Sequence, residues 1–337
     1  MFSLFQTKED EVVAIQPQFN RGCFGKIEFS NVWIDFNLLD SDLNEFRKQL
    51  RNAVGMLARK KPITNAAIQK HMPELNFILM NPDLNTANAG VISPRVDASG
   101  RPFPFVIFSN IHNCRLQRQS AAVPVLLQEF FEQASALQLL DWKNSNLEHL
   151  QDSVAALPMV SSDLTRSRLF DGVMDLLKGT DVVSFWQGIP LEDTRVERAK
   201  FLVTITSLLK TVIAKSALKT SWGLRLPLPK TDFVLPYVVF YIQLIESHLK
   251  DSAWQAQVFW NSANDHQAAS FTIFFKAVKA SMLCQLMDPT IKDGDIIDVL
   301  EEMERCGKPT EQAFMVTGND KDSLMDALFK WVGFNQL

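Results

Sequence analysis

The side chains that could do chemistry are few and scattered in this 337-residue chain. Its five histidines lie far apart, and no two of them have the four-residue spacing of a helical zinc site. His112 and Cys114 come nearest to a pair of metal ligands, but two ligands are too few to hold a metal. We therefore expect neither a metal nor another cofactor.

The stretch Gly22–Lys26 has a superficial likeness to a phosphate-binding loop. That loop needs four residues between its glycines and a hydroxyl residue after the lysine, whereas here two residues intervene and Ile27 follows. The two glycines are better explained as positions where the backbone turns and packs under a neighbouring element. One enzymatic alternative stays open, in which distant residues assemble a site around Asp97, Arg101 and His112.

Composition excludes further classes of protein. With 34 basic and 38 acidic residues, the net charge of −4 lacks the basic excess of a nucleic-acid binder. Four cysteines far apart are typical of thiols in a reducing compartment. The most apolar segment, Phe233–Ile245, contains a proline and is shorter than the roughly 20 residues of a membrane span. The N-terminus has no signal-peptide pattern, so we expect a cytoplasmic protein without membrane insertion.

Hydrophobic periodicity in the first half predicts strands, then helices, then a returning strand. The expected strands are one or two within Gly22–Phe36, then Leu75–Met80, Gly90–Ser93, Phe103–Ser109 and Val182–Trp186. The expected helices are one that Asp40 caps and Pro62 ends, then Val125–Leu140, Ser145–Leu157 and Asp163–Lys178.

The second half repeats these element types in another order. Strands are expected at Trp222–Leu228, Gln257–Trp260 and Ser270–Phe275. Helices are expected at Arg195–Leu218, Val234–Leu249, Lys276–Leu286, Asp293–Arg305 and Lys321–Val332. The patterns predict an α+β protein of two domains, residues 1–190 and 191–337, each a mainly antiparallel β-sheet flanked by α-helices in a layered sandwich.

Aromatic residues are the strongest hint of function from composition. The chain has 25 Phe and 7 Trp but only 2 Tyr. Five of the aromatic side chains fall near predicted strand ends or turns, where they are often partly exposed: Phe185, Trp186, Trp222, Trp254 and Trp260. Part-exposed aromatic residues of this kind are typical anchors of protein–protein surfaces.

The stretch Gly90–Ser109 predicts a β-hairpin, because two apolar runs flank a segment of Asp, Ser, Gly and Pro. Gly100 can adopt a positive φ, and Asp97 can accept hydrogen bonds from nearby backbone N–H groups. The turn itself does not need Arg101. We expect that Arg101 either pairs with Asp97 and fixes the loop or presents its charge to a partner.

Three stretches, in order, resemble the TagF family of bacterial type VI secretion. Gly22–Ile27 is similar to the family's G-x-[FY]-G-K-[IL]-P-x-x-G-D-F, and Gly90–Pro104 is similar to G-V-x-x-P-S-x-D-x-x-G-R-x-F-P. Ser184–Trp186 is similar to S-x-W-W, with Gln187 at the second tryptophan, and Trp222–Leu228 is similar to a W-G-x-R-L-P-L stretch of longer members. The first motif departs at Glu28, which replaces proline, and at residues 31–33, where Asn-Val-Trp replaces Gly-Asp-Phe. The residues taken over from these motifs are Gly22, Gly25, Lys26, Pro94, Asp97, Gly100, Arg101, Phe103, Pro104, Ser184, Trp186 and Trp222.

The resemblance implies a cytoplasmic, non-enzymatic repressor that acts after translation to hold the secretion machine off. It implies a protein partner within the apparatus, either a forkhead-associated (Fha-type) scaffold or the cytoplasmic domain of the membrane complex, and no nucleic acid. It also implies an antiparallel sheet flanked by helices. A structural or assembly subunit of the apparatus is the alternative, beside the enzyme already mentioned.

Overall fold

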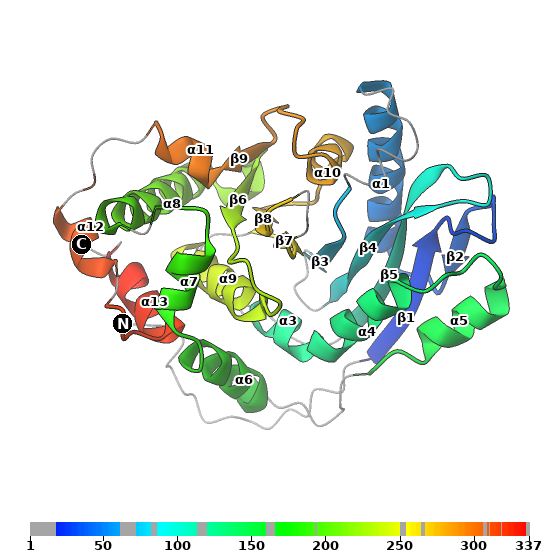
Figure 1. The fold of residues 1–337 in the computed structure, drawn as a ribbon, viewed down its shortest axis with the longest axis horizontal. Helices are drawn as coiled ribbons and strands as arrows, with labels where there is room; N and C mark the ends of the chain where they lie inside the picture. Colours follow the sequence, from blue (N-terminus) through cyan, green and yellow to red (C-terminus); the bar gives the residue numbers. More distant parts are fainter. Residues whose placement is uncertain are drawn as a thin grey trace.

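A computed structural model describes residues 18–60, 72–81, 86–112, 120–159, 166–192, 194–249, 254–263, 267–305, 309, 311–317 and 319–334. Its described residues form helices around one mixed sheet, so the predicted α+β class is confirmed (Figure 1). None of the described helices is long and apolar enough to cross a membrane.

Nine strands of the described chain form one sheet, in the order β2-β1-β5-β4-β3-β7-β8-β6-β9. Neighbouring strands are antiparallel except at the β6–β9 edge, where they are parallel. The strands are β1 (Gln18–Gly25), β2 (Ile34–Phe36), β3 (Leu75–Met80), β4 (Ala87–Val96), β5 (Pro102–His112), β6 (Gly223–Pro227), β7 (Gln257–Asn261), β8 (Ser270–Phe274) and β9 (Ile296–Asp298).

The two halves of the chain meet in the middle of this sheet. Strand β3 from the first half pairs with β7 from the second, with Phe77 opposite Phe259. The strands on either side of residue 190 therefore do not form two separate sheets. A division into domains 1–190 and 191–337 stays a prediction.

Helices cover both faces of the sheet in layers. Alternate residues of the strands point into one of two apolar cores, as Phe77 and Ile78 do. The core that contains Phe77 is closed by α1 (Ser41–Lys60) and α10 (Ala280–Met287). The core that contains Ile78 is closed by α3 (Ala122–Leu126), α4 (Gln128–Gln138), α5 (Leu147–Ala155), α6 (Arg166–Lys178), α7 (Val182–Gly188), α8 (Arg195–Lys215), α9 (Leu235–Leu249), α11 (Val299–Met303) and α13 (Leu324–Phe334).

Helix α1 shows how the local signals act. Oδ1 of Asp40 accepts hydrogen bonds from the backbone N–H groups of Asp42 and Leu43, both at 2.9 Å, as predicted for a cap. The apolar stripe that includes Phe46 and Leu50 is buried against the sheet. The described part of the helix ends at Lys60, just before the predicted stop.

Two predicted elements are wrong. Residues 182–186 form α7 and not a strand, because Asp181 accepts a hydrogen bond from Ser184 N at 2.7 Å and caps a helix. Within the predicted helix Asp293–Arg305, residues 296–298 form strand β9 instead, because Ile296 and its neighbours pair with β6. Its helical part, α11, is limited to residues 299–303.

The expected exposure of the aromatic residues is also wrong for three of the five. Phe185, Trp186 and Trp260 are buried, because α7 and β7 lie inside the layered cores. Trp222 and Trp254 are half-buried. Proximity to an expected strand end did not predict exposure of Phe185 and Trp186, because both lie in helix α7. Their rings pack against each other, and the ring of Trp186 also packs against Phe201.

Candidate functional site

The predicted hairpin is confirmed, and its turn is built around Asp97. Strands β4 and β5 pair from Ala87–Ile111 to Val96–Pro102, which leaves residues 97–101 as the turn. Asp97 N donates to Arg101 O at 2.9 Å, and Gly100 N donates to Asp97 O at 2.8 Å. Gly100 has a φ of 74°, a left-handed conformation that glycine adopts without strain.

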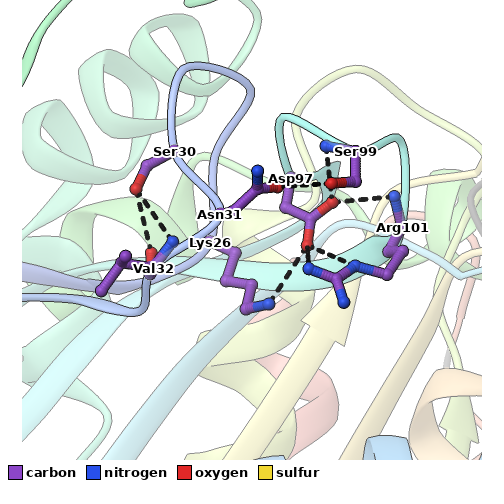
Figure 2. Close-up of polar contacts among 7 residues, drawn as sticks. All are labelled: Lys26, Ser30, Asn31, Val32, Asp97, Ser99 and Arg101. Atoms are coloured by element: carbon purple, nitrogen blue, oxygen red, sulfur yellow. Dashed lines mark hydrogen bonds and ion pairs between the residues drawn. The ribbon is translucent and has the colours of Figure 1, made fainter.

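The Asp97 carboxylate is completely buried and fully engaged (Figure 2). Its Oδ1 accepts hydrogen bonds from the backbone N–H groups of Ser99 and Arg101, both at 3.0 Å. Its Oδ2 accepts from Arg101 Nε at 2.8 Å and from Lys26 Nζ at 3.1 Å. A buried carboxylate is stable only when it is paired in this way.

These contacts set the protonation state of Asp97. Burial alone would raise its pKa, but the hydrogen bonds from Arg101, Lys26 and Ser99 outweigh burial and lower the pKa from 3.8 to about 2. Asp97 is therefore ionised at neutral pH and is a poor proton acceptor.

The hairpin turn is also fastened to the loop that follows β1. Ala98 N donates to Ser30 O at 3.2 Å, and Ser99 Oγ donates to Asn31 Oδ1 at 2.8 Å. Ser30 Oγ in turn accepts from Val32 N at 3.1 Å, which shapes the loop (Figure 2). Asn31, one of the departures from the first motif, thus contacts the second motif directly.

Aromatic and cationic side chains cover this junction. Lys26 Nζ lies 4.3 Å from the centre of the Phe103 ring, and Trp33 contacts Phe103 edge-on, with ring centres 6.3 Å apart. Arg51 of α1 lies over the Trp33 ring at 5.9 Å. We call the group formed by Lys26, Ser30, Asn31, Val32, Trp33, Asp97, Ser99, Arg101 and Phe103 the Asp97 corner.

The Asp97 corner presents part of itself to solvent. Arg101 is held by Asp97 along one edge, yet 52% of its side chain is exposed. Both expectations for Arg101 are compatible with this position, because the same guanidinium fixes the loop and reaches the surface. Val32, in the separate loop between β1 and β2, is 72% exposed.

A second ion pair beside the Asp97 corner was missed from the sequence. Arg95 Nε lies 3.0 Å from Glu28 Oε1, and its Nη2 donates to Glu28 Oε2 at 3.0 Å. Arg95 also donates to the backbone oxygens of Gln138 and Leu140, both at 2.7 Å. Glu28 stands at the proline of the first motif and Arg95 at the serine of the second, so the two departures pair with each other. The opposite charges of Glu28 and Arg95 were the feature of the sequence that could have suggested this pair.

The motif glycines serve close packing, as the sequence indicated. A Cβ at Gly22 would lie 2.3 Å from Phe36 O, and a Cβ at Gly25 would lie 2.5 Å from Pro104 O. Gly25 also has a φ of 131°, which disfavours any side chain. Gly25 of the first motif thus fits directly against Pro104 of the second motif. Pro104 in turn pairs with Pro94 in the β4–β5 ladder.

The remaining candidate residues lie elsewhere. Ser184 donates from its backbone N–H and its Oγ to Asp181, which caps α7. Trp186 is buried against Phe201 and Trp331. Figure 1 shows α7 in the half of the molecule away from β1 and β2. Trp222 immediately precedes β6 and packs edge-on against Phe275. The fold therefore unites the first two motifs but not the third, nor Trp222.

Metal and thiol chemistry have little support in the described part of the chain. No cluster of three His, Cys, Asp or Glu residues there is suited to a metal. Cys23 and Cys284 are both buried. Cys114 and the side chain of His112 lie outside the described residues.

A family model agrees with the motifs that meet at the Asp97 corner. Residues 22–157 match the model of the TagF N-terminal domain, described as type VI secretion system-associated. No curated protein matches the chain. The crystal structure of PA0076 from Pseudomonas aeruginosa PAO1 is similar at 13% identity and a TM-score of 0.48, over 82% of this chain and 97% of that one. Residues 22–157, which hold both motifs of the corner, therefore form a TagF N-terminal domain of the type VI secretion system-associated kind.

Proposed function

We propose that this protein represses type VI secretion after translation, by binding a cytoplasmic protein component of the apparatus rather than by catalysing a reaction. The observation that supports this most is the meeting of two TagF motifs at one partly exposed corner. A repressor that acts by binding needs a rigid recognition surface. The engaged, ionised Asp97 supplies rigidity and not proton transfer.

The exposed part of the Asp97 corner has the chemistry of a recognition surface. Arg101 offers a guanidinium whose orientation is already fixed by Asp97, so little side-chain entropy is lost on binding. Arginine and tryptophan are the residue types that most often carry binding energy at interfaces, and Trp33 lies beside the exposed Val32. We propose that the partner offers acidic groups to Arg101. The candidates are an Fha-type scaffold and the cytoplasmic domain of the membrane complex.

Deletion of the gene tests repression itself. Secretion of the tube protein should rise in the deletion strain, and overexpression of the wild-type protein should lower it. Secretion that does not change in either direction would refute the proposed repression.

Complementation then tests the surface. Arg101→Ala and Val32→Glu should fail to restore repression, since both alter the exposed part of the Asp97 corner. Arg305→Ala is the matched control, because Arg305 is an exposed arginine far along the chain, paired only with Glu302 among the described residues. Val32→Glu leaves the Asp97 ion pairs intact, so its folding should match the wild type in thermal melts.

Pull-downs with the same variants identify the partner. Wild-type protein and Arg305→Ala should capture the same apparatus component, and Val32→Glu should lose it. Full repression and full capture by both corner variants would show that this surface is not the interface.

A further inference from the structure

A cavity of about 500 Å³ lies in a different part of the molecule from the Asp97 corner. It is lined mainly by residues of β6, β7, β8 and the segment that follows α10, and no residue of the Asp97 corner lines it. Phe259, Trp260 and Leu286 give it apolar walls, and Arg225 and Thr272 contribute polar groups. Its volume falls in the range of about 300–1,000 Å³ typical of small-molecule sites.

Arg225 is the unusual group in this cavity. Its neighbours Leu224 and Leu226 point into the core, so Arg225 points to the opposite face of β6, beside its ladder partner Thr272. Burial lowers the pKa of Arg225, against the opposing effect of Asp298 and Glu301. Among the described residues, its guanidinium makes one hydrogen bond, from Nη2 to Gln285 O at 3.4 Å, and no ion pair within 4.0 Å.

A half-buried guanidinium with one long hydrogen bond has unused binding capacity. Arginine carries five N–H donors in a planar fork that matches a carboxylate in two parallel hydrogen bonds. Asp298 and Glu301 attract this cation but, among the described residues, accept no hydrogen bond from it, so a carboxylate in the cavity would supply the hydrogen-bonded partner that they do not. Arg225 therefore favours an anionic ligand.

Two aspartates that also line the cavity limit the charge of that ligand. Asp298 Oδ1 caps α11 by accepting from Leu300 N at 3.0 Å. Asp288 Oδ1 accepts from Thr290 N at 3.0 Å and from Thr290 Oγ1 at 2.6 Å. These carboxylates would repel a dianion such as phosphate more strongly than a monoanion.

We propose that this cavity binds a small organic monocarboxylate with an apolar body. Its carboxylate pairs with the Arg225 guanidinium beside Thr272, and its apolar body lies against Phe259 and Leu286. The site draws mostly on residues after 190, outside the matched TagF segment. It goes beyond the proposed repression, and either proposal can fail without the other.

Ligand-observed NMR with 3-phenylpropionate tests the site on the full chain. Binding should be saturable at millimolar concentrations, and Arg225→Gln should weaken it by about tenfold or more, as expected for loss of a charge-assisted, bidentate pair. Arg198→Gln is the matched control, because Arg198 is a largely buried arginine that pairs with Asp320 and does not line the cavity. The control should bind within about twofold of the wild type.

Three results would overturn the proposal. They are no saturable binding of 3-phenylpropionate by the wild type, equal binding by folded Arg225→Gln, and binding of inorganic phosphate as tight as that of 3-phenylpropionate. If thermal melts show that Arg225→Gln is unfolded, Arg225→Lys replaces it. Lysine keeps the charge and loses the planar fork, so affinity should still fall, and unchanged affinity would contradict the assignment.

Discussion

Replacing Asp97 by asparagine tests whether its negative charge holds the Asp97 corner together. Asparagine keeps an oxygen that can accept from Ser99 N and Arg101 N, but it loses the charge that pairs with Lys26 and the Arg101 side chain. Two cations would then face a neutral amide in a buried place. We expect Asp97→Asn to destabilise the protein at neutral pH.

The pKa of Asp97 gives the magnitude of this loss of unfolding free energy. A drop from 3.8 to about 2 corresponds to roughly 2.5 kcal/mol at neutral pH, at about 1.4 kcal/mol per pKa unit. Arg101 is half exposed, so solvent screens part of this interaction, and we expect a loss of about 1–2 kcal/mol. Because the folded-state pKa lies below the ordinary value, this stabilisation is present above pH 3.8 and is lost as the pH falls towards 2.

Urea unfolding of wild type and variant across this pH range is the assay. The difference in unfolding free energy should be largest at neutral pH and should shrink as the pH falls through the folded-state pKa. Asp152→Asn is the control, because Asp152 is an exposed carboxylate of α5, and its effect should stay within about 0.5 kcal/mol. A difference between wild type and Asp97→Asn that does not vary with pH would refute the electrostatic reasoning.

Three further predictions concern buried groups. Burial raises the pKa of Glu246 to about 7, above its ordinary 4.5, despite hydrogen bonds from Ser120, so its contribution to stability falls as pH rises from 4.5 to 7. Glu246→Gln should remove that decline and be the more stable protein above pH 7 in urea titrations; an unchanged pH profile would contradict this. Gly90→Ala should lower the unfolding free energy by about 3 kcal/mol or more, because the new Cβ would lie 2.2 Å from Ile107 O in a central strand. A loss within experimental error would show that the strand can move to make room. Burial raises the pKa of the Cys23 thiol to about 12, and Asp35 adds to the effect. Iodoacetamide should therefore leave this thiol unmodified in the native protein and alkylate it in urea, as measured by mass spectrometry of the peptide that contains Cys23. Fast labelling of the native protein would contradict the burial.

Local patterns in the sequence predicted most elements because their signals act over a few residues. The cap at Asp40, the apolar run Leu75–Met80 and the hairpin at Gly90–Ser109 all appear as expected. Residues 182–186 were misassigned because their β-branched and aromatic side chains favour a strand on propensity alone. The Asp181 cap and burial of Phe185 and Trp186 on one side of a helix outweigh that propensity.

The sequence indicated some residues of the Asp97 corner but not their assembly, and their role in binding stays a prediction. The motif spacing alone indicated Lys26, Asp97 and Arg101. The sequence could not show that Lys26 and Asp97 are 3.1 Å apart, because 71 residues separate them and only the β1–β5 and β4–β5 pairings bring them together. The Glu28–Arg95 pair depends on the same pairings.

The sequence by itself determined the class of fold, the hairpin with its Asp97 turn, and the TagF motifs, because periodicity, turn chemistry and motif spacing are local properties. Only the tertiary structure decided that β3 and β7 join the two halves of the chain in one sheet, and that Arg225 lines a cavity. Strand pairing over such separations depends on how whole apolar faces pack, and no short stretch of sequence encodes that choice.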